Sequence, residues 1–165
     1  MSARAVIDSL EFARSGGEIR GEVPLAELGR LADSLHDRDG QLRFTLSGLT
    51  DGRQSPRLRL KVAGALNLNC QRCLGRLQHE VEQESSLLLL EAGVAGESDG
   101  VDDLDAVAAD AEMDVWSLVE DEVLLALPIA PRHAEGACQA AGEPGLKQRA
   151  SPFAVLAGLK SKQVN

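Results

Sequence analysis

Aromatic side chains are scarce in this sequence. Only 2% of the 165 residues are aromatic, comprising one tryptophan, three phenylalanines and no tyrosine. Because apolar residues still make up 44% of the chain, any core must consist mainly of leucine, valine and alanine. So few rings also leave few surfaces on which nucleic-acid bases could stack.

Long apolar runs and an export signal are also missing. The leucines from Leu87 to Leu90 form a strand-sized run, and no apolar stretch approaches the about 20 residues needed to cross a bilayer. Asp8 and Glu11 interrupt the N-terminal segment where a signal peptide needs continuous apolar residues. We therefore expect a cytoplasmic protein without a membrane partner.

Lysine and arginine are absent from the middle of the chain. Between Glu80 and Pro131 there are fifteen acidic residues and no basic one. The rest of the chain carries all 17 basic residues and 11 acidic ones, so the middle accounts for the net charge of −9. Such an acidic segment suits a basic partner such as a ribosomal protein, and it equally suits a solubilising segment without a partner.

Alternating apolar and polar residues predict an antiparallel sheet. The alternation covers residues 41–49, 57–70 and 76–90, and turn-like residues separate these ranges. In the first two ranges the apolar positions are even-numbered, which puts them on one face. Gly64 interrupts the second range as a possible bulge.

Helices are predicted on either side of these strands. Pro24 and leucines at helical spacing predict a helix over residues 24–35. Asp114 is a suitable N-cap for a second helix that continues to Leu127 and ends at Pro128. The expected fold is therefore an α+β domain in which helices flank an antiparallel sheet.

Two further segments complete the predicted single domain of residues 1–165. Residues 91–112 are small and acidic, so they bury too little apolar surface to offset their ordering entropy, and we expect a disordered, mobile insertion. Pro152 begins a predicted C-terminal helix. The apolar face of that helix is expected to contact a partner or the domain itself, through Phe153, Leu156 and Leu159.

The three cysteines favour metal binding or plain thiols over a disulfide framework, since their number is odd and no export signal precedes them. Cys70 and Cys73 form a C-x2-C pair at the end of a predicted strand, and His133 and Cys138 follow in a later loop. A two-residue gap lets one tight turn aim two thiolates at an ion, and the later pair completes the four ligands of zinc. The alternative is four side chains that never meet.

The same C-x2-C pair could instead serve thiol redox exchange. That chemistry relies on a thiolate stabilised at a helix N-terminus, whereas the residues after Cys73 alternate like a strand. The chain has no glycine-rich phosphate loop, no G-x-S-x-G and no H-E-x-x-H. We therefore expect neither an enzyme nor a small-molecule substrate.

A basic stripe is predicted on the polar face of the sheet. Its members are the odd-numbered residues Arg43, Arg57, Arg59 and Lys61. Such a stripe could bind RNA phosphates. A merely solvated face is the favoured alternative, because the net negative charge of the chain repels nucleic acid.

Four pieces of the sequence together resemble the YceD family of large ribosomal RNA subunit accumulation proteins. They are NCQRC, DVWSLVEDEVLLALPIAPRH, the later Cys138 and SPFAVLAGLK. The resemblance implies a non-enzymatic accessory role in ribosome biogenesis, with large-subunit ribosomal RNA or ribosomal proteins as partners. It also implies a candidate site at Cys70, Cys73, His133 and Cys138. The alternatives are a zinc-binding adaptor without a ribosomal role and a thiol redox protein.

Overall fold

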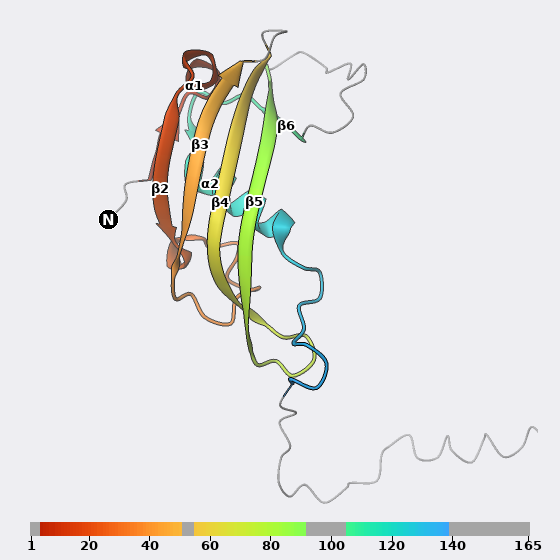
Figure 1. Cartoon of the computed structure of the whole chain (residues 1–165). Coiled ribbons are helices and arrows are strands. Elements are labelled where there is room, and N and C mark those ends of the chain that lie inside the picture. Colours follow the sequence, from red (N-terminus) through yellow and green to blue (C-terminus); the bar gives the residue numbers. More distant parts are fainter. Residues whose placement is uncertain (1–3, 51–54, 92–104, 139–165) are drawn as a thin grey trace, which may run out of the picture.

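A curved five-stranded sheet forms the centre of the computed structural model (Figure 1). The structure describes residues 4–50, 55–91 and 105–138. The first four strands pair antiparallel with their neighbours, and the fifth pairs parallel with the fourth. In spatial order the strands are β2 (Glu18–Pro24), β3 (Gln41–Thr50), β4 (Pro56–Asn69), β5 (Arg76–Leu90) and β6 (Asp105–Ala108).

The predicted alternation sets the two faces of this sheet. Leu46 lies opposite Leu60, and Phe44 lies opposite Val62, so the even-numbered residues of β3 and β4 meet on one face. These four side chains are at most 5% exposed. The α+β fold and the three antiparallel strands are therefore confirmed.

The helix α2 (Val115–Ala126) covers the apolar face of the sheet, behind β4 and β5 in Figure 1. The carboxylate of Asp114 accepts a hydrogen bond from the backbone N–H of Trp116, which confirms the predicted N-cap. Trp116 itself is 7% exposed and belongs to the core. Among the described residues, no helix has the length and apolar character needed to span a membrane.

The N-terminal segment contains elements that the sequence analysis did not assign. The short helix α1 (Ser9–Ser15) packs against β3 and β4, and β2 follows it. A two-residue strand, β1 (Val6–Ile7), pairs with β7 (Met113–Asp114) just before α2. Local signals for α1 were present, since Asp8 caps its start and Gly16 ends it with a positive φ of 66°.

The predicted helix over residues 24–35 is wrong. Only η1 (Leu25–Glu27) is helical, as a single 3-10 turn, and separate turns follow it up to Leu35. The leucines are buried as the pattern required, because their three- and four-residue spacing suits successive turns as well as a helix. The backbone N–H groups of Arg30 and Leu31 donate to the carboxylate of Glu120 in α2, which makes a continuous helix impossible here.

Gly64 does not form a bulge. The ladder between β4 and β5 runs through it without interruption, with Gly64 directly opposite Val81. A Cβ atom at this position would lie 2.7 Å from Cδ2 of Leu42 on β3. The glycine therefore makes room for a buried leucine of the neighbouring strand.

The predicted insertion is shorter than expected at its C-terminal end. Residues 92–104 lie outside the described residues, but β6 follows them and pairs with Leu87–Leu90 of β5. This pairing needs only backbone hydrogen bonds, so the small, acidic composition did not prevent it. The sheet is consequently mixed rather than wholly antiparallel. The predicted C-terminal helix, with Phe153, Leu156 and Leu159, lies outside the described residues.

A buried carboxylate ties α2 to the segment after η1. Glu120 is 7% exposed, and its Oε1 accepts hydrogen bonds from the backbone N–H groups of Arg30 at 2.6 Å and Leu31 at 3.2 Å. Its Oε2 accepts from Nε of Arg30 at 3.0 Å. The neighbouring Asp121 also contacts Arg30 but is half exposed.

We expect Glu120→Ala to lower the free energy of unfolding by about 3 kcal/mol, because the buried N–H group of Leu31 and the partly buried N–H group of Arg30 lose their acceptor. Asp121→Ala is the matched control, since it removes an exposed ion pair with the same arginine and should cost less than about 1 kcal/mol. Urea unfolding of both variants measures the difference. Equal losses of unfolding free energy in the two variants would show that the buried contact stabilises the fold no more than the exposed ion pair does.

Candidate metal centre

A tight turn between β4 and β5 holds the first half of the site. The N–H of Leu74 donates to the carbonyl of Cys70 at 2.8 Å, and the N–H of Cys70 donates to that of Gly75 at 3.0 Å. Leu74 adopts a positive φ of 57°, which lets the chain reverse within the turn. The turn places Cys70 in the interior and leaves Cys73 half-buried.

The loop after α2 brings the second half of the site to this turn. The N–H of Gln71 donates to the carbonyl of Pro131 at 2.8 Å, which attaches the loop to the turn. His133 and Cys138 follow on this loop, and both are half-buried. Two segments about 60 residues apart in the sequence therefore meet through backbone contacts next to the cysteines.

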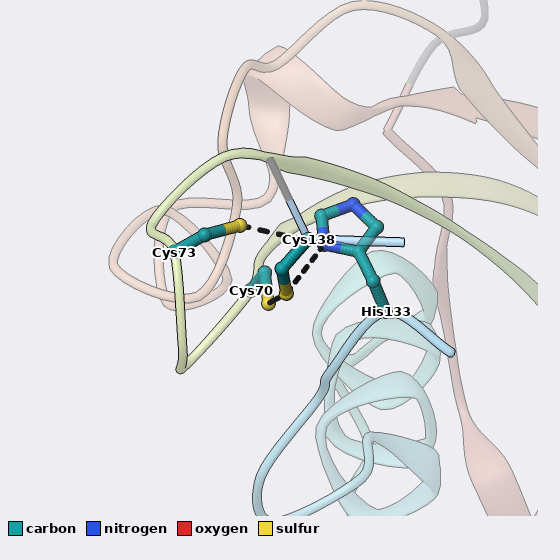
Figure 2. A group of neighbouring side chains, drawn as sticks. All are labelled: Cys70, Cys73, His133 and Cys138. Carbon is teal, nitrogen blue, oxygen red and sulfur yellow. Dashed lines mark hydrogen bonds between the residues drawn. The ribbon is translucent and has the colours of Figure 1, made fainter. Parts of the chain in front are cut away.

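The four predicted ligands converge, as Figure 2 shows. The Sγ atoms of Cys70 and Cys138 are 3.6 Å apart. The Nδ1 atom of His133 lies 3.4 Å from Sγ of Cys73 and 3.6 Å from Sγ of Cys138. One ligand atom from each residue lies within 4.8 Å of all the others. This cluster, called the Cys3His cluster below, could hold a metal ion.

The imidazole of His133 is oriented for ligation through Nδ1. Its Nε2 lies 2.9 Å from the carbonyl oxygen of Arg76 and donates to it, because a carbonyl can only accept. In the neutral ring Nδ1 is then the unprotonated nitrogen, and it faces the three sulfur atoms. A hydrogen bond of this kind fixes the tautomer and orientation of many metal-binding histidines.

Electrostatics around the cluster favour thiolates at two of the cysteines. Burial opposes ionisation of Cys70, but backbone hydrogen bonds from His133, Arg72 and Cys73 outweigh it and lower the pKa of that thiol to about 5. Burial likewise opposes ionisation of Cys138. A hydrogen bond from Nε of Arg72, at 2.9 Å, and one from Nδ1 of His133 when its ring is protonated nevertheless lower the pKa of the Cys138 thiol.

The other two groups of the cluster respond to these negative sulfurs. At Cys73, a backbone hydrogen bond at Gly75 is outweighed by burial and the nearby Cys70 and Cys138, so the pKa of this thiol rises. The pKa of His133 is raised by hydrogen bonding to Cys138 and to the carbonyl of Arg76. Three thiolates this close together repel one another, so the three cysteines resist ionising together. The positive charge of a bound metal ion would offset this repulsion.

Arg72 is the neighbour whose contact with the cluster the sequence analysis missed. Its guanidinium contacts Sγ of Cys138 and the carbonyl of Ala134. Arg76, at the start of β5, pairs with Asp37. The position of Arg72 between Cys70 and Cys73 was the feature of the sequence that could have indicated its contact with the cluster.

The predicted basic stripe lies on the outer face of the sheet, opposite the core. Its four residues share this face as expected, because Lys61 lies opposite Thr45 and Arg59 opposite Ser47. Arg59 and Lys61 both pair with Glu84 of β5, at 3.7 and 3.1 Å. Arg43 lies opposite Glu22 of β2. Acidic residues of both neighbouring strands therefore flank the stripe.

Comparison with known proteins places the chain in a family. The model of the family described as "Large ribosomal RNA subunit accumulation protein YceD" matches residues 58–160. A relative of that name from Haemophilus influenzae (strain ATCC 51907 / DSM 11121 / KW20 / Rd) is 28% identical over 94% of this chain and 95% of its own length. No solved structure gave a significant match. Since the matched range covers most of the chain, including nearly all of β4, all of β5 and α2, and the four residues of the Cys3His cluster, the chain belongs to the YceD family.

Proposed function

We propose that this protein is a non-enzymatic, cytoplasmic accessory factor that supports the accumulation of large-subunit ribosomal RNA. The observation that carries the proposal is the family match across residues 58–160. The name of the relative describes the same role for that protein, over nearly its whole length. The cluster itself supports a non-catalytic role. Four protein ligands would occupy all four coordination positions of a tetrahedral ion and would leave none for a substrate.

The ion proposed for the Cys3His cluster is zinc. Zinc–sulfur bonds of about 2.3 Å in a tetrahedron put neighbouring sulfurs about 3.8 Å apart. The 3.6 Å between Cys70 and Cys138 fits this spacing, as do the sulfur–nitrogen distances of 3.4 and 3.6 Å to His133. Arg72 adds a positive charge beside a donor set that carries three thiolates when bound. A closed site of this kind would join the β4–β5 turn to the loop after α2.

Cys73→Ser should lose about one zinc ion per chain and lower the melting temperature by about 10 °C, because a structural metal contributes folding free energy. His79→Gln, on β5 and outside the cluster, should retain both the metal and the melting temperature. Elemental analysis and thermal unfolding of the purified proteins measure the two effects. If a chelator leaves the melting temperature of the unaltered chain unchanged, the cluster holds no structural metal.

Two surfaces support contact with the ribosomal partners. The basic stripe could bind phosphates of large-subunit RNA, although Glu84 already occupies Arg59 and Lys61. The acidic side chains of β5 and of the chain after it suit basic ribosomal proteins. Contacts through Phe153, Leu156 and Leu159 stay a prediction.

Replacing Arg57, Arg59 and Lys61 together by glutamine should weaken RNA binding and reduce its logarithmic salt slope by about 2 to 3, since each phosphate contact contributes about 0.7 to 0.9. The control replaces three exposed arginines that lie off this face, Arg14, Arg38 and Arg132. Binding to a large-subunit RNA fragment at several salt concentrations measures both slopes. Equal slopes for the two variants would identify the stripe as a solvated face.

Cells that lack this protein should contain less large-subunit RNA relative to small-subunit RNA, together with fewer complete large subunits. A restored intact copy should correct the deficit, and a Cys70→Ser copy should not, because the proposed metal site would be lost. RNA quantification and gradient profiles measure these levels, with matched protein amounts confirmed for both copies. A normal profile in the deficient cells would refute the proposed function.

A further inference from the structure

One long edge of the sheet is open in the described part of the chain. β5 pairs with β4 along almost its whole length, but on its other side β6 pairs only with Leu87–Leu90. Apart from β4, no described segment makes a backbone hydrogen bond to Leu77–Ser86. About half of the N–H and C=O groups of these residues point away from β4, because backbone groups alternate in direction along a strand. Leu77–Ser86 is called the open edge below.

The helix α2 continues beyond this open edge. Leu118, Glu122 and Leu125 follow one another at helical spacing, so they lie on one side of the helix. The first two are buried beneath the sheet, and the carboxylate of Glu122 accepts a hydrogen bond from the hydroxyl of Ser85 on β5. Leu125, one turn later, is 76% exposed. Figure 1 shows the end of α2 emerging past β5. Because Leu125 follows Glu122 by one turn on the same side of the helix, and Glu122 contacts β5, we expect one more strand beside β5 to reach this leucine.

Three carboxylates border the open edge on the other face of the sheet. Glu80, Glu82 and Glu84 alternate along β5 and are all exposed. Glu84 is paired with Lys61 and Arg59, and Glu80 accepts a hydrogen bond from Gln78. A strand added here would therefore place one set of its side chains beside carboxylates and the other set over Leu125.

We propose that the open edge binds an extended, lysine- or arginine-rich segment of a partner polypeptide, which adds to the sheet as a strand beside β5. Basic side chains on one face pair with the glutamates, apolar side chains on the other cover Leu125, and the backbone supplies the hydrogen bonds. The assignment to a basic ribosomal protein rests on the proposed function. Binding of a basic strand at the open edge does not depend on the proposed function.

The charge of the edge argues against two other occupants. A second copy of this chain would bring its own row of glutamates to the same place, and like charges on adjacent strands repel. RNA phosphates would meet the same repulsion. The opposite edge strand, β2, is a poorer template, because it spans only seven residues and ends at Pro24, which has no N–H to donate.

The test uses the full chain and an acetylated nine-residue peptide that alternates lysine and valine. Binding should protect the amides of the open edge from hydrogen exchange, since the new strand occupies them. A peptide of the same sequence that is N-methylated at alternate residues, on the side facing β5, should bind at least about ten-fold more weakly, because it cannot form the ladder. A peptide with glutamate in place of lysine should not bind.

Variants of the protein distinguish the contribution of the glutamates on one face of the sheet from that of Leu125 on the other. Replacing Glu80, Glu82 and Glu84 by glutamine should weaken binding about ten-fold, since each cross-strand pair contributes modestly. The charge-matched control replaces three exposed glutamates near the other edge of the sheet, Glu18, Glu22 and Glu27. Leu125→Ser should also weaken binding, whereas Val6→Ser, at a residue 59% exposed elsewhere, should not.

Three results would overturn the proposal. The first is that the N-methylated peptide binds as tightly as the unmethylated one. The second is that the peptide protects amides outside the open edge, and not those within it, from hydrogen exchange. The third is that the chain forms a dimer that protects this edge from exchange in the absence of peptide. Each is read from purified components, so it is independent of ribosomal RNA levels in cells. Peptide binding with a normal RNA profile would refute the proposed function alone, and an RNA deficit without binding at the edge would refute this inference alone.

Discussion

The pairing of β4 with β5 is the constraint on which the rest of the structure depends. The ladder extends from Arg57 opposite Leu88 to Asn69 opposite Arg76. The apolar side chains of β4 form the centre of the core, and the turn that joins the two strands carries Cys70 and Cys73. A change of register by one residue would turn every side chain to the other face and would displace both cysteines. The same hairpin therefore fixes the core and two of the candidate metal ligands.

The helix α2 connects this hairpin to the remaining parts of the chain through both apolar and polar contacts. Trp116 and its neighbours bury an apolar face against the sheet, while two buried acids bind other segments. Glu120 binds the turn at Arg30, and Glu122 binds Ser85 on β5. Because the loop after α2 carries His133 and Cys138, the position of the helix also decides whether the metal ligands can meet. Buried polar contacts of this kind specify one arrangement of the helix when all partners are present.

The surfaces of the sheet divide between mixed and negative charge. On the outer face, basic residues of β3 and β4 lie between acidic residues of β2 and β5, so ion pairs reduce the field of the stripe. At the open side of β5 the balance is different, because Glu80, Glu82 and Glu84 are acidic and no lysine or arginine lies between Leu77 and Ser86. Edge strands often carry charged residues that prevent uncontrolled pairing. A charge of one sign also selects for partners of the opposite sign.

Local features of this protein could be predicted from its residues alone. Alternation fixed the faces of β3, β4 and β5, Asp114 marked the start of α2, and the C-x2-C spacing with His133 and Cys138 identified the ligands that the structure brings together. These features depend on neighbouring residues, so a pattern can reveal them. The tertiary structure decided what depends on distant partners. Glu120 takes the N–H groups that a helix over residues 24–35 would need, β6 pairs parallel to β5, and Gln71 joins the loop that carries the second half of the site. Leu125 lies exposed beyond β5 for the same reason, because burial depends on which strand lies nearby and not on the residue itself.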